Sequence, residues 1–222
     1  MFTIHGVPMS VHTRKAIVTA IIKGVDYKLE PVIPFNPPPN WGALSPTGLI
    51  PVMEDGDFTL ADSTAICQYL ERTHPSPAIL PADDKDFGRT LWFDGYAGGT
   101  VYRHVVHGLF VQKIIRPVIL KETTDLSVIE TILATVQPKV FQYLDSQAGR
   151  PFLVGRALTL ADIAIVSNMI NYQYLGFAID RGRYPRLATY VRGVVGHEAF
   201  QRALATEQPF AEQMGLDRTF LE

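Results

Sequence analysis

Three short stretches of this sequence place polar groups where the backbone could present them to a small ligand. The first holds Ser10, in GVPMSVHTRKA, between a predicted strand and a predicted helix. In a small α/β sheet this is the carboxyl edge, where ligands bind, and a hydroxyl there can donate a hydrogen bond. The serine could instead serve only as the helix N-cap, which is the commoner role. Ser-His-Asp catalysis fits poorly, because G-x-S-x-G is missing and the nearest base, His12, is only two residues away.

The second stretch is the Ile50-Pro51 pair in SPTGLIPV. A proline that opens a strand does least harm there, and this one follows a turn-rich segment. If the bond before it is cis, the backbone N–H and C=O of Ile50 turn outward and can pair with an extended peptide. Because only about 5–6% of such bonds are cis in folded proteins, an ordinary trans proline at a strand start stays open as the alternative.

The third stretch is Asp62-Ser63 in DFTLADSTAICQYLE, where a helix is predicted to begin. Helix N-termini carry unpaired N–H groups and partial positive charge, so they bind carboxylates. The N–H and hydroxyl of Ser63 could hold an α-carboxylate, and the Asp62 side chain could pair with an α-ammonium group. Together they would recognise the amino-acid end of a small peptide. In the alternative interpretation Asp62 only caps the helix, which contributes about 1 kcal/mol.

The elements that must position these stretches alternate between strand and helix patterns over the first 75 residues. They are strands at 2–5 and 27–32, a helix at 10–24 between them, a β-hairpin around Asp55-Gly56, and a helix from Asp62. The proline-dense segment at 33–48 excludes a regular strand or a long helix. This order predicts a small mixed sheet flanked by helices.

After the proline-rich stretch HPSPAILPADD, only helical periodicity remains. We therefore predict an N-terminal α/β domain at 1–75, a linker at 76–85, and an all-helical domain at 86–222. The second domain should contain about five or six helices of ordinary length.

The composition describes a globular chain, with 47% hydrophobic and 19% charged residues in 222. A formal net charge of −2 argues against nucleic acid or an anionic membrane as a partner, since both need a concentrated basic face. The N-terminus shows no signal-sequence pattern, and no apolar window is long enough to span a bilayer. Cys67 is the only cysteine, which excludes an intramolecular disulfide or a cysteine-built metal cluster. A reducing, cytoplasmic setting fits best.

Taken in order, these motifs resemble the cytosolic glutathione S-transferases. G-x-P-x-S-x-x-T-R around Ser10 looks like the serine-type active site of the phi, theta, zeta-like and bacterial members. SPTGLIPV and DFTLADSTAICQYLE resemble two further motifs of the N-terminal domain. FLVGRALTLADIAI, with Thr159 and Asp162, resembles the buried capping box of the helical domain. The resemblance covers nearly the whole chain and implies a thioredoxin-like domain followed by a helical bundle.

The resemblance implies roles for these residues in binding glutathione. Ile50-Pro51 would be cis and, with Leu49, hold the cysteinyl backbone, while Asp62 and Ser63 would hold the γ-glutamyl end. The free thiol has a pKa of about 8.5, and only the thiolate attacks well. A hydrogen bond donated by Ser10, with the positive end of the first helix, would stabilise the thiolate. The thiolate would then attack a small hydrophobic electrophile, and the usual product is a thioether.

The sequence departs from the family pattern in ways that predict weak glutathione binding. Leu49 stands where many relatives carry Lys or Gln, and 36–44 lacks the Lys or His that often grips the glycyl carboxylate. Asp62 replaces the commoner Glu. Three alternatives to conjugation stay open. Ser10 with Arg14 resembles the zeta-like maleylacetoacetate isomerases, which implies a glutathione-dependent isomerase. Leu49 and the missing basic residue favour a non-catalytic carrier, and the third alternative is a protein-interaction module with the same fold.

The electrophile pocket of the family lies between its two domains, and we expect its walls among scattered side chains of both. The candidates are Met9, His12, Phe35, Arg103, His104 and His107. His104 and His107 have no carboxylate or cysteine at helical spacing, so we predict no metal. Cys67 is predicted to be packed rather than reactive. The family also implies a homodimer, and this expectation comes from the resemblance alone.

Overall fold

The computed structural model describes residues 2–149 and 151–221, beginning with a four-stranded sheet in the order β2-β1-β3-β4. The strands are β1 (Phe2–His5), β2 (Tyr27–Glu30), β3 (Val52–Asp55) and β4 (Phe58–Ala61). β1 is parallel to β2, whereas β3 is antiparallel to both β1 and β4. The predicted mixed sheet is confirmed, and β2 stops two residues short of the predicted strand end.

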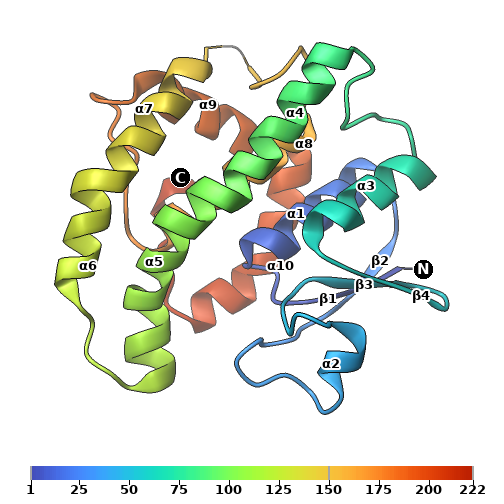
Figure 1. Cartoon of the computed structure of the whole chain (residues 1–222), viewed down its shortest axis with the longest axis horizontal. Coiled ribbons are helices and arrows are strands. Elements are labelled where there is room, and N and C mark those ends of the chain that lie inside the picture. Colours follow the sequence, from blue (N-terminus) through green and yellow to red (C-terminus); the bar gives the residue numbers. More distant parts are fainter. Residues whose placement is uncertain (1, 150, 222) are drawn as a thin grey trace.

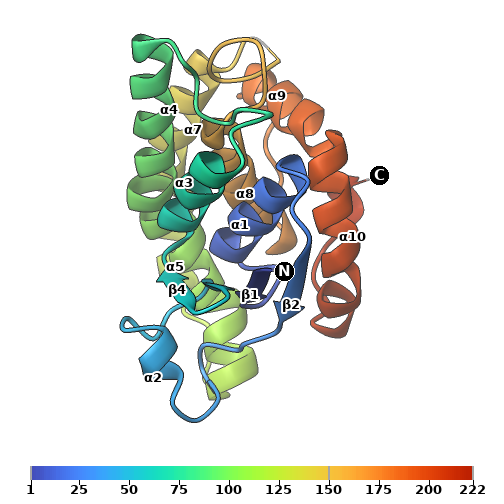
Figure 2. The ribbon, with the colours of Figure 1, turned by 90° about the vertical axis from the view of Figure 1, so that its right-hand side faces the viewer.

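Three helices accompany the sheet: α1 (Val11–Ile22), α2 (Trp41–Leu44) and α3 (Ser63–Thr73). Figures 1 and 2 show α1 and α3 on one face of the sheet and α2 on the other. The face under α2 is closed by a small apolar cluster of Val32, Trp41 and Val52. α1 ends where predicted because Gly24 takes a positive φ of 63° just after it.

The second part of the chain is helical and begins with one long, continuous helix. Its successive segments are α4 (Asp84–Tyr96), η1 (Ala97–Val106), α5 (His107–Phe110) and η2 (Val111–Leu120), of which η1 and η2 have π-helical hydrogen bonding. A second composite helix follows, made of α6 (Leu126–Thr131), η3 (Ile132–Val136) and α7 (Gln137–Gln147). The remaining helices are α8 (Leu160–Tyr174), α9 (Pro185–Val195), α10 (Glu198–Gln213) and the short 3₁₀ helix η4 (Thr219–Leu221).

Helix α8 is the centre of the helical domain, because nearly all of its side chains are buried. It begins at the predicted capping box, in which the Thr159 backbone N–H donates to the Asp162 carboxylate at 2.8 Å. α1 of the first domain packs against α8 and α10 (Figure 2). These observations confirm the fold class, a thioredoxin-like α/β domain followed by an all-helical domain.

The segment between the two domains lies after α3 ends at Thr73 and before α4 begins at Asp84. The division of the chain at 76–85 stays a prediction. Among residues 2–149 and 151–221, no helix is long and apolar enough to cross a membrane.

Candidate functional site

The pairing of the strands brings three loops together at one end of β3. His5 of β1 lies opposite Val52, and Ala61 of β4 lies opposite the same residue. Each of these three residues is next to a loop or a helix start. Gly6 follows His5 and begins the loop before α1, and Pro51 precedes Val52 and ends the loop before β3. Asp62 follows Ala61 at the start of α3. Strand register therefore places the three predicted stretches side by side, although they lie far apart in the sequence.

Gly6 holds the loop before Ser10 tightly against the loop before β3. A Cβ atom on Gly6 would lie 2.5 Å from Thr13 Oγ1 and 3.3 Å from the Cβ of Ile50, and its φ is +154°. Only glycine fits such an approach without a shift of its neighbours. The packing role of Gly6 leaves no signal in the local sequence, because Ile50, which it approaches, lies far along the chain.

Ser10 is the N-cap of α1, and its hydroxyl oxygen accepts a long hydrogen bond of 3.5 Å from Thr13 N–H. A serine hydroxyl has one proton to donate and two lone pairs to accept with. Capping uses only a lone pair, so the proton of this half-buried hydroxyl remains available to a ligand. The capping and donor interpretations of Ser10 are therefore compatible.

The peptide bond between Ile50 and Pro51 is cis, as the resemblance implies. The loop before it is braced from within, since Trp41 Nε1 donates to Gly48 O at 3.1 Å and Ser45 Oγ donates to Leu49 O at 2.7 Å. Trp41 is buried, so its indole does not reach outward as a grip for a glycyl carboxylate. The Leu49 side chain is 64% exposed and offers only an apolar surface.

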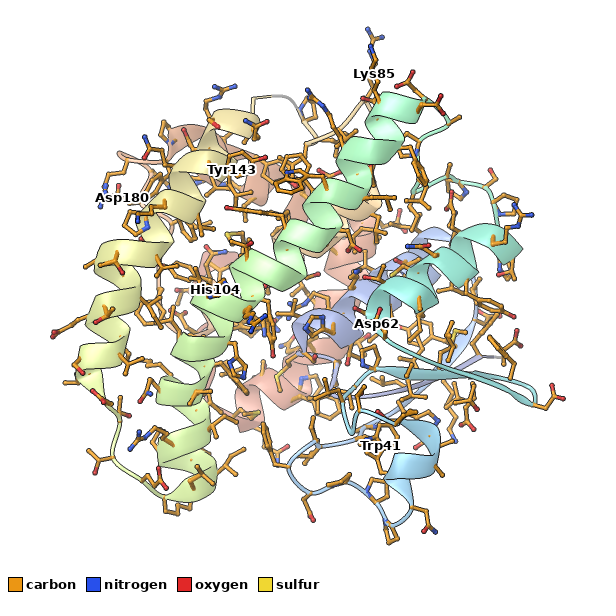
Figure 3. All side chains as sticks on the ribbon, in the orientation of Figure 1. Trp41, Asp62, Lys85, His104, Tyr143 and Asp180 are labelled. Carbon is orange, nitrogen blue, oxygen red and sulfur yellow. The ribbon has the colours of Figure 1, made fainter. Side chains whose placement is uncertain are left out.

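Asp62 caps α3 with a single carboxylate oxygen, Oδ1, which accepts from Thr64 N–H at 2.8 Å and Ala65 N–H at 3.1 Å. Its backbone has φ 77° and ψ 128°, a conformation that non-glycine residues rarely adopt and that often marks a functional site. Figure 3 labels Asp62 at the start of α3, across from the long helix that carries His104. Both cap hydrogen bonds go to Oδ1, and Oδ2 takes part in neither of them.

A cavity of about 460 Å³ opens beside Asp62, between α1, α3 and α4. Ser63, the first residue of α3, is buried in its wall, and the Ser63 hydroxyl lies 3.4 Å from His12 Nδ1. A buried ion pair between Lys15 and Asp94 closes the cavity on the α4 side. The polar residues that line it are His12, Lys15, Asp62, Ser63, Thr64, Gln68, Asp94 and Asn168. Apolar side chains of Val11, Leu91, Ala97 and Ala164 complete the lining. The cavity therefore offers polar groups to a small ligand on walls that are otherwise largely apolar.

Comparison with known proteins identifies the family. The family models described as "Glutathione S-transferase, N-terminal domain" and "Glutathione S-transferase, C-terminal domain" match residues 4–78 and 111–207. Human glutathione S-transferase theta-1 is 30% identical over 168 residues, which cover 72% of this chain and 68% of that protein. A glutathione S-transferase of Triticum aestivum is 27% identical over 208 residues, 94% and 95% of the two chains. The chain belongs to the glutathione S-transferase family.

A solved structure supports the same fold. The glutathione S-transferase from Rhodospirillum rubrum F11 matches with a TM-score of 0.83 over 92% of both chains, at 24% sequence identity. Membership makes the chain a glutathione transferase enzyme, of a family whose co-substrate is glutathione. The three stretches at the end of β3 therefore lie in the glutathione S-transferase N-terminal domain.

The other residues that were predicted to line the electrophile pocket of this glutathione S-transferase differ in how far they are buried. The Met9 side chain is buried and only 6% exposed, whereas Phe35 is 52% exposed. Arg103, His104 and His107 lie exposed on the long helix and outside the cavity beside Asp62. Their place in an electrophile pocket stays a prediction. Across the residues that the structure describes, no group of three or more His, Cys, Asp or Glu side chains could hold a metal ion.

Cys67 is fully buried in α3, in agreement with the prediction that it is packed. Burial raises the pKa of its thiol to about 11, and Thr19 Oγ1 lies 3.2 Å from the sulfur. A thiol that is inaccessible and protonated at neutral pH is a poor nucleophile. The only cysteine of the transferase is therefore unsuited to disulfide exchange.

His12 lines the cavity and links the two domains of the transferase. Its ring packs edge-on against Tyr102 of η1, with 4.6 Å between ring centroids, and Tyr102 in turn lies 5.6 Å from the ring of His107. Burial, followed by the charge of Lys15, lowers the pKa of His12 from 6.5 to about 4. The imidazole is therefore neutral at physiological pH and can accept or donate one hydrogen bond to Ser63.

We expect His12 to stay neutral from pH 8 down to about pH 5. Because its folded-state pKa is lower than its unfolded-state pKa, the unfolded chain binds the proton first as the pH falls. The free energy of unfolding should therefore fall between pH 6.5 and pH 4, by at most about 1.4 kcal/mol per pH unit from this residue. NMR titration of the imidazole, with urea unfolding at each pH, measures both effects.

The matched control is His12→Gln, which removes the titrating group and keeps a polar side chain of similar length. This variant should lose part of the decline in stability below pH 6.5. An imidazole that titrates near pH 6.5 in the folded protein, or an identical pH profile of the variant, would contradict the neutral assignment.

Proposed function

We propose that this enzyme conjugates the thiolate of glutathione to a small hydrophobic electrophile, as in detoxification. The observation that supports this function is the meeting of the Gly6–Ser10 loop, Ile50-Pro51 and Asp62-Ser63 at one end of β3. In the reaction the sulfur lone pair forms a C–S bond. In the electrophile one bond to the attacked carbon breaks. Its electron pair leaves with a leaving group, or stays on an atom of an opened ring or a former double bond.

The two ends of the site suit different parts of glutathione. The Ile50 backbone would pair with the cysteinyl unit as a short added strand. The N-terminus of α3 at Ser63 would hold the γ-glutamyl carboxylate, while Asp62 Oδ2 would meet the ammonium group. Asn168 Oδ1 is buried at the cavity and has no hydrogen-bond partner among the described residues. It could therefore accept a hydrogen bond from a cationic group of the ligand.

Ser10 would act as a donor and not as a nucleophile. Its free proton and the positive end of α1 both favour the thiolate over the thiol. Each unit by which the thiol pKa falls requires about 1.4 kcal/mol of preferential thiolate stabilisation. A charge-assisted hydrogen bond together with the helix terminus can supply that amount.

We further propose a cytoplasmic homodimer. Large aromatic side chains are exposed on the edge of the first domain and on the long helix, namely Phe58 on β4 and Phe87 and Trp92 on α4. Exposed aromatic groups that lie over two domains favour an interface with a second protein surface. The lone, buried Cys67 suits a reducing compartment.

Product analysis tests the conjugation directly. We expect the protein to be retained on immobilised glutathione and to consume free thiol in step with thioether formation, on a panel of aryl halides, epoxides, enones and isothiocyanates. Thiol titration and mass spectrometry of the products measure the two sides of this balance. Isomerised product with unchanged thiol would overturn conjugation in favour of an isomerase. Failure to bind glutathione would favour the non-catalytic interpretations.

A matched variant for the binding step is Asp62→Asn. The amide oxygen can still cap α3, so the fold is retained, but the negative charge that would face the ammonium group is lost. Retention on glutathione should weaken about tenfold or more, because hydrogen bonds to charged groups contribute about 1.5–3 kcal/mol. Unchanged retention would show that Asp62 only caps the helix.

A further inference from the structure

A fully buried arginine joins the first helix to the helical domain. Arg14 on α1 is 0% exposed, and its guanidinium Nε and Nη2 donate to the two carboxylate oxygens of Glu207 on α10, at 2.6 and 2.7 Å. Its Nη1 donates to Ser167 O at 2.8 Å and to Asn171 Oδ1 at 2.6 Å, both on α8. The paired charge of Glu207 offsets the cost of burying the cation.

The fifth guanidinium N–H reaches the residue directly before Ser10. Arg14 Nη2 donates to Met9 O at 3.3 Å, so all five donors of the group have an acceptor. The side chain amide of Asn171 donates to the same carbonyl through Nδ2, at 3.0 Å. Since Asn171 Oδ1 accepts from Arg14, the orientation of the amide is fixed, and its N–H₂ group faces Met9.

This carbonyl belongs to the same rigid unit as the start of Ser10. A peptide group is planar, so Met9 O, Ser10 N and Ser10 Cα move together. The hydroxyl oxygen of Ser10 is then two rotatable bonds from that unit, the N–Cα bond and the Cα–Cβ bond. Ser10 N–H donates to Val7 O at 3.0 Å, which closes the turn from the other side. A displacement of Met9 O therefore moves the hydroxyl directly.

We propose that Asn171 is a positioning residue for Ser10: its amide, held by Arg14, fixes the Met9–Ser10 peptide and so sets where the Ser10 hydroxyl donates. This inference rests on the proposed function, in which that hydroxyl stabilises the thiolate of glutathione. It places part of the control of the N-terminal site on α8 of the second domain. Placement errors of about 1 Å are sufficient to weaken a directional hydrogen bond and its catalytic effect.

The same network extends to the end of the chain. Tyr174 OH donates to Glu207 Oε2 at 2.9 Å, and Arg218 Nη1 lies 3.3 Å from the Tyr174 hydroxyl. The titratable groups of this hydrogen-bond network are Arg14, Glu207, Tyr174 and Arg218. The two buried charges form a pair, so replacing the neutral amide of Asn171 by an apolar group changes no charge near the thiol.

The test measures the ionisation of glutathione bound to Asn171→Leu by the ultraviolet absorbance of the thiolate as a function of pH. We expect the apparent pKa of the bound thiol to rise by about 0.5 to 1 unit, and kcat/KM at neutral pH to fall about 3- to 10-fold. The KM for glutathione should change less than twofold, because Asn171 lies at Met9 O and not at the γ-glutamyl end. Gln173→Leu is the matched control, since this amide lies on the same helix and donates to Met169 O.

A double-mutant cycle separates positioning from a general structural effect. In the Ser10→Ala background, Asn171→Leu should produce no further rise in the thiol pKa, because the hydroxyl that it positions is gone. An equal rise in both backgrounds would overturn the inference, as would a wild-type-like pKa in Asn171→Leu. If the wild-type protein itself binds no glutathione thiolate, the proposed function fails, and this inference, which rests on it, fails as well.

Thermal unfolding of each variant controls for folding, and Asn171→Ala is the second variant if Asn171→Leu does not fold. Ala removes the donor without adding bulk beside Met9. Loss of the folded state in both variants would contradict the inference, since the amide would then be a requirement of the fold itself.

Discussion

Replacing Ser10 with alanine is expected to lower kcat/KM at neutral pH by about 10- to 100-fold and to raise the apparent pKa of bound glutathione by about one to two units. The physical reason is the loss of one hydrogen bond to a charged acceptor, which contributes about 1.5–3 kcal/mol. Activity should recover at higher pH, where the thiol ionises without help. Initial rates over a pH series, together with the thiolate absorbance of the complex, measure both quantities.

The controls separate this donor role from capping. Ser10→Thr keeps a hydroxyl that can cap and donate, so its thiol pKa should stay near that of the wild type. Loss of the cap in Ser10→Ala should cost at most about 1 kcal/mol of stability, because the bond from Thr13 N–H is already long at 3.5 Å. Ser127→Ala removes an exposed serine hydroxyl at the start of α6 and should leave the rate unchanged. A wild-type pKa in Ser10→Ala would mean that another group stabilises the thiolate.

The parts of the fold that depend on local chemistry could be predicted from the sequence. Gly24 ends α1, Gly56 makes the hairpin turn with a φ of 63°, and Asp62 begins α3, all where the residue types indicated. These signals work because a turn or cap is decided by a few neighbouring residues. The order of the motifs then sufficed to indicate the family, whose fold fixes how the strands pair.

The contacts that complete the site could not be predicted, because they join residues that are distant in the sequence. Arg14 and Glu207 are 193 positions apart, and nothing in the spacing around either residue indicates the pair. The positive φ of Asp62 also lacks a signal, since such a backbone usually marks glycine. For the electrophile pocket, helical periodicity cannot tell which of His104 and His107 faces the first domain. Side chain packing decides that, and it places Tyr102 against His12.

One carboxylate holds together the start of the central helix and two neighbouring segments. Asp162 is 0% exposed and accepts hydrogen bonds from Leu153 N–H at 2.8 Å and from Tyr190 OH at 2.9 Å through Oδ1. Its Oδ2 accepts from the Thr159 N–H at 2.8 Å and from the Thr159 hydroxyl at 3.0 Å. It thus connects the loop before α8, the cap of α8, and α9. Four buried donors depend on this one side chain.

We therefore expect Asp162→Ala to lower the free energy of unfolding by about 3–5 kcal/mol, because buried donors left without an acceptor each cost about 1–3 kcal/mol and the site relaxes only in part. In a chain of this size the midpoint of thermal unfolding should fall by about 10 °C. Calorimetry and urea unfolding measure the change. The matched control is Asp125→Ala, which removes the exposed aspartate that caps α6 through Ser127 N–H and should cost about 1 kcal/mol. Equal losses in the two variants would mean that the buried bonds at Asp162 contribute no more than an ordinary surface cap.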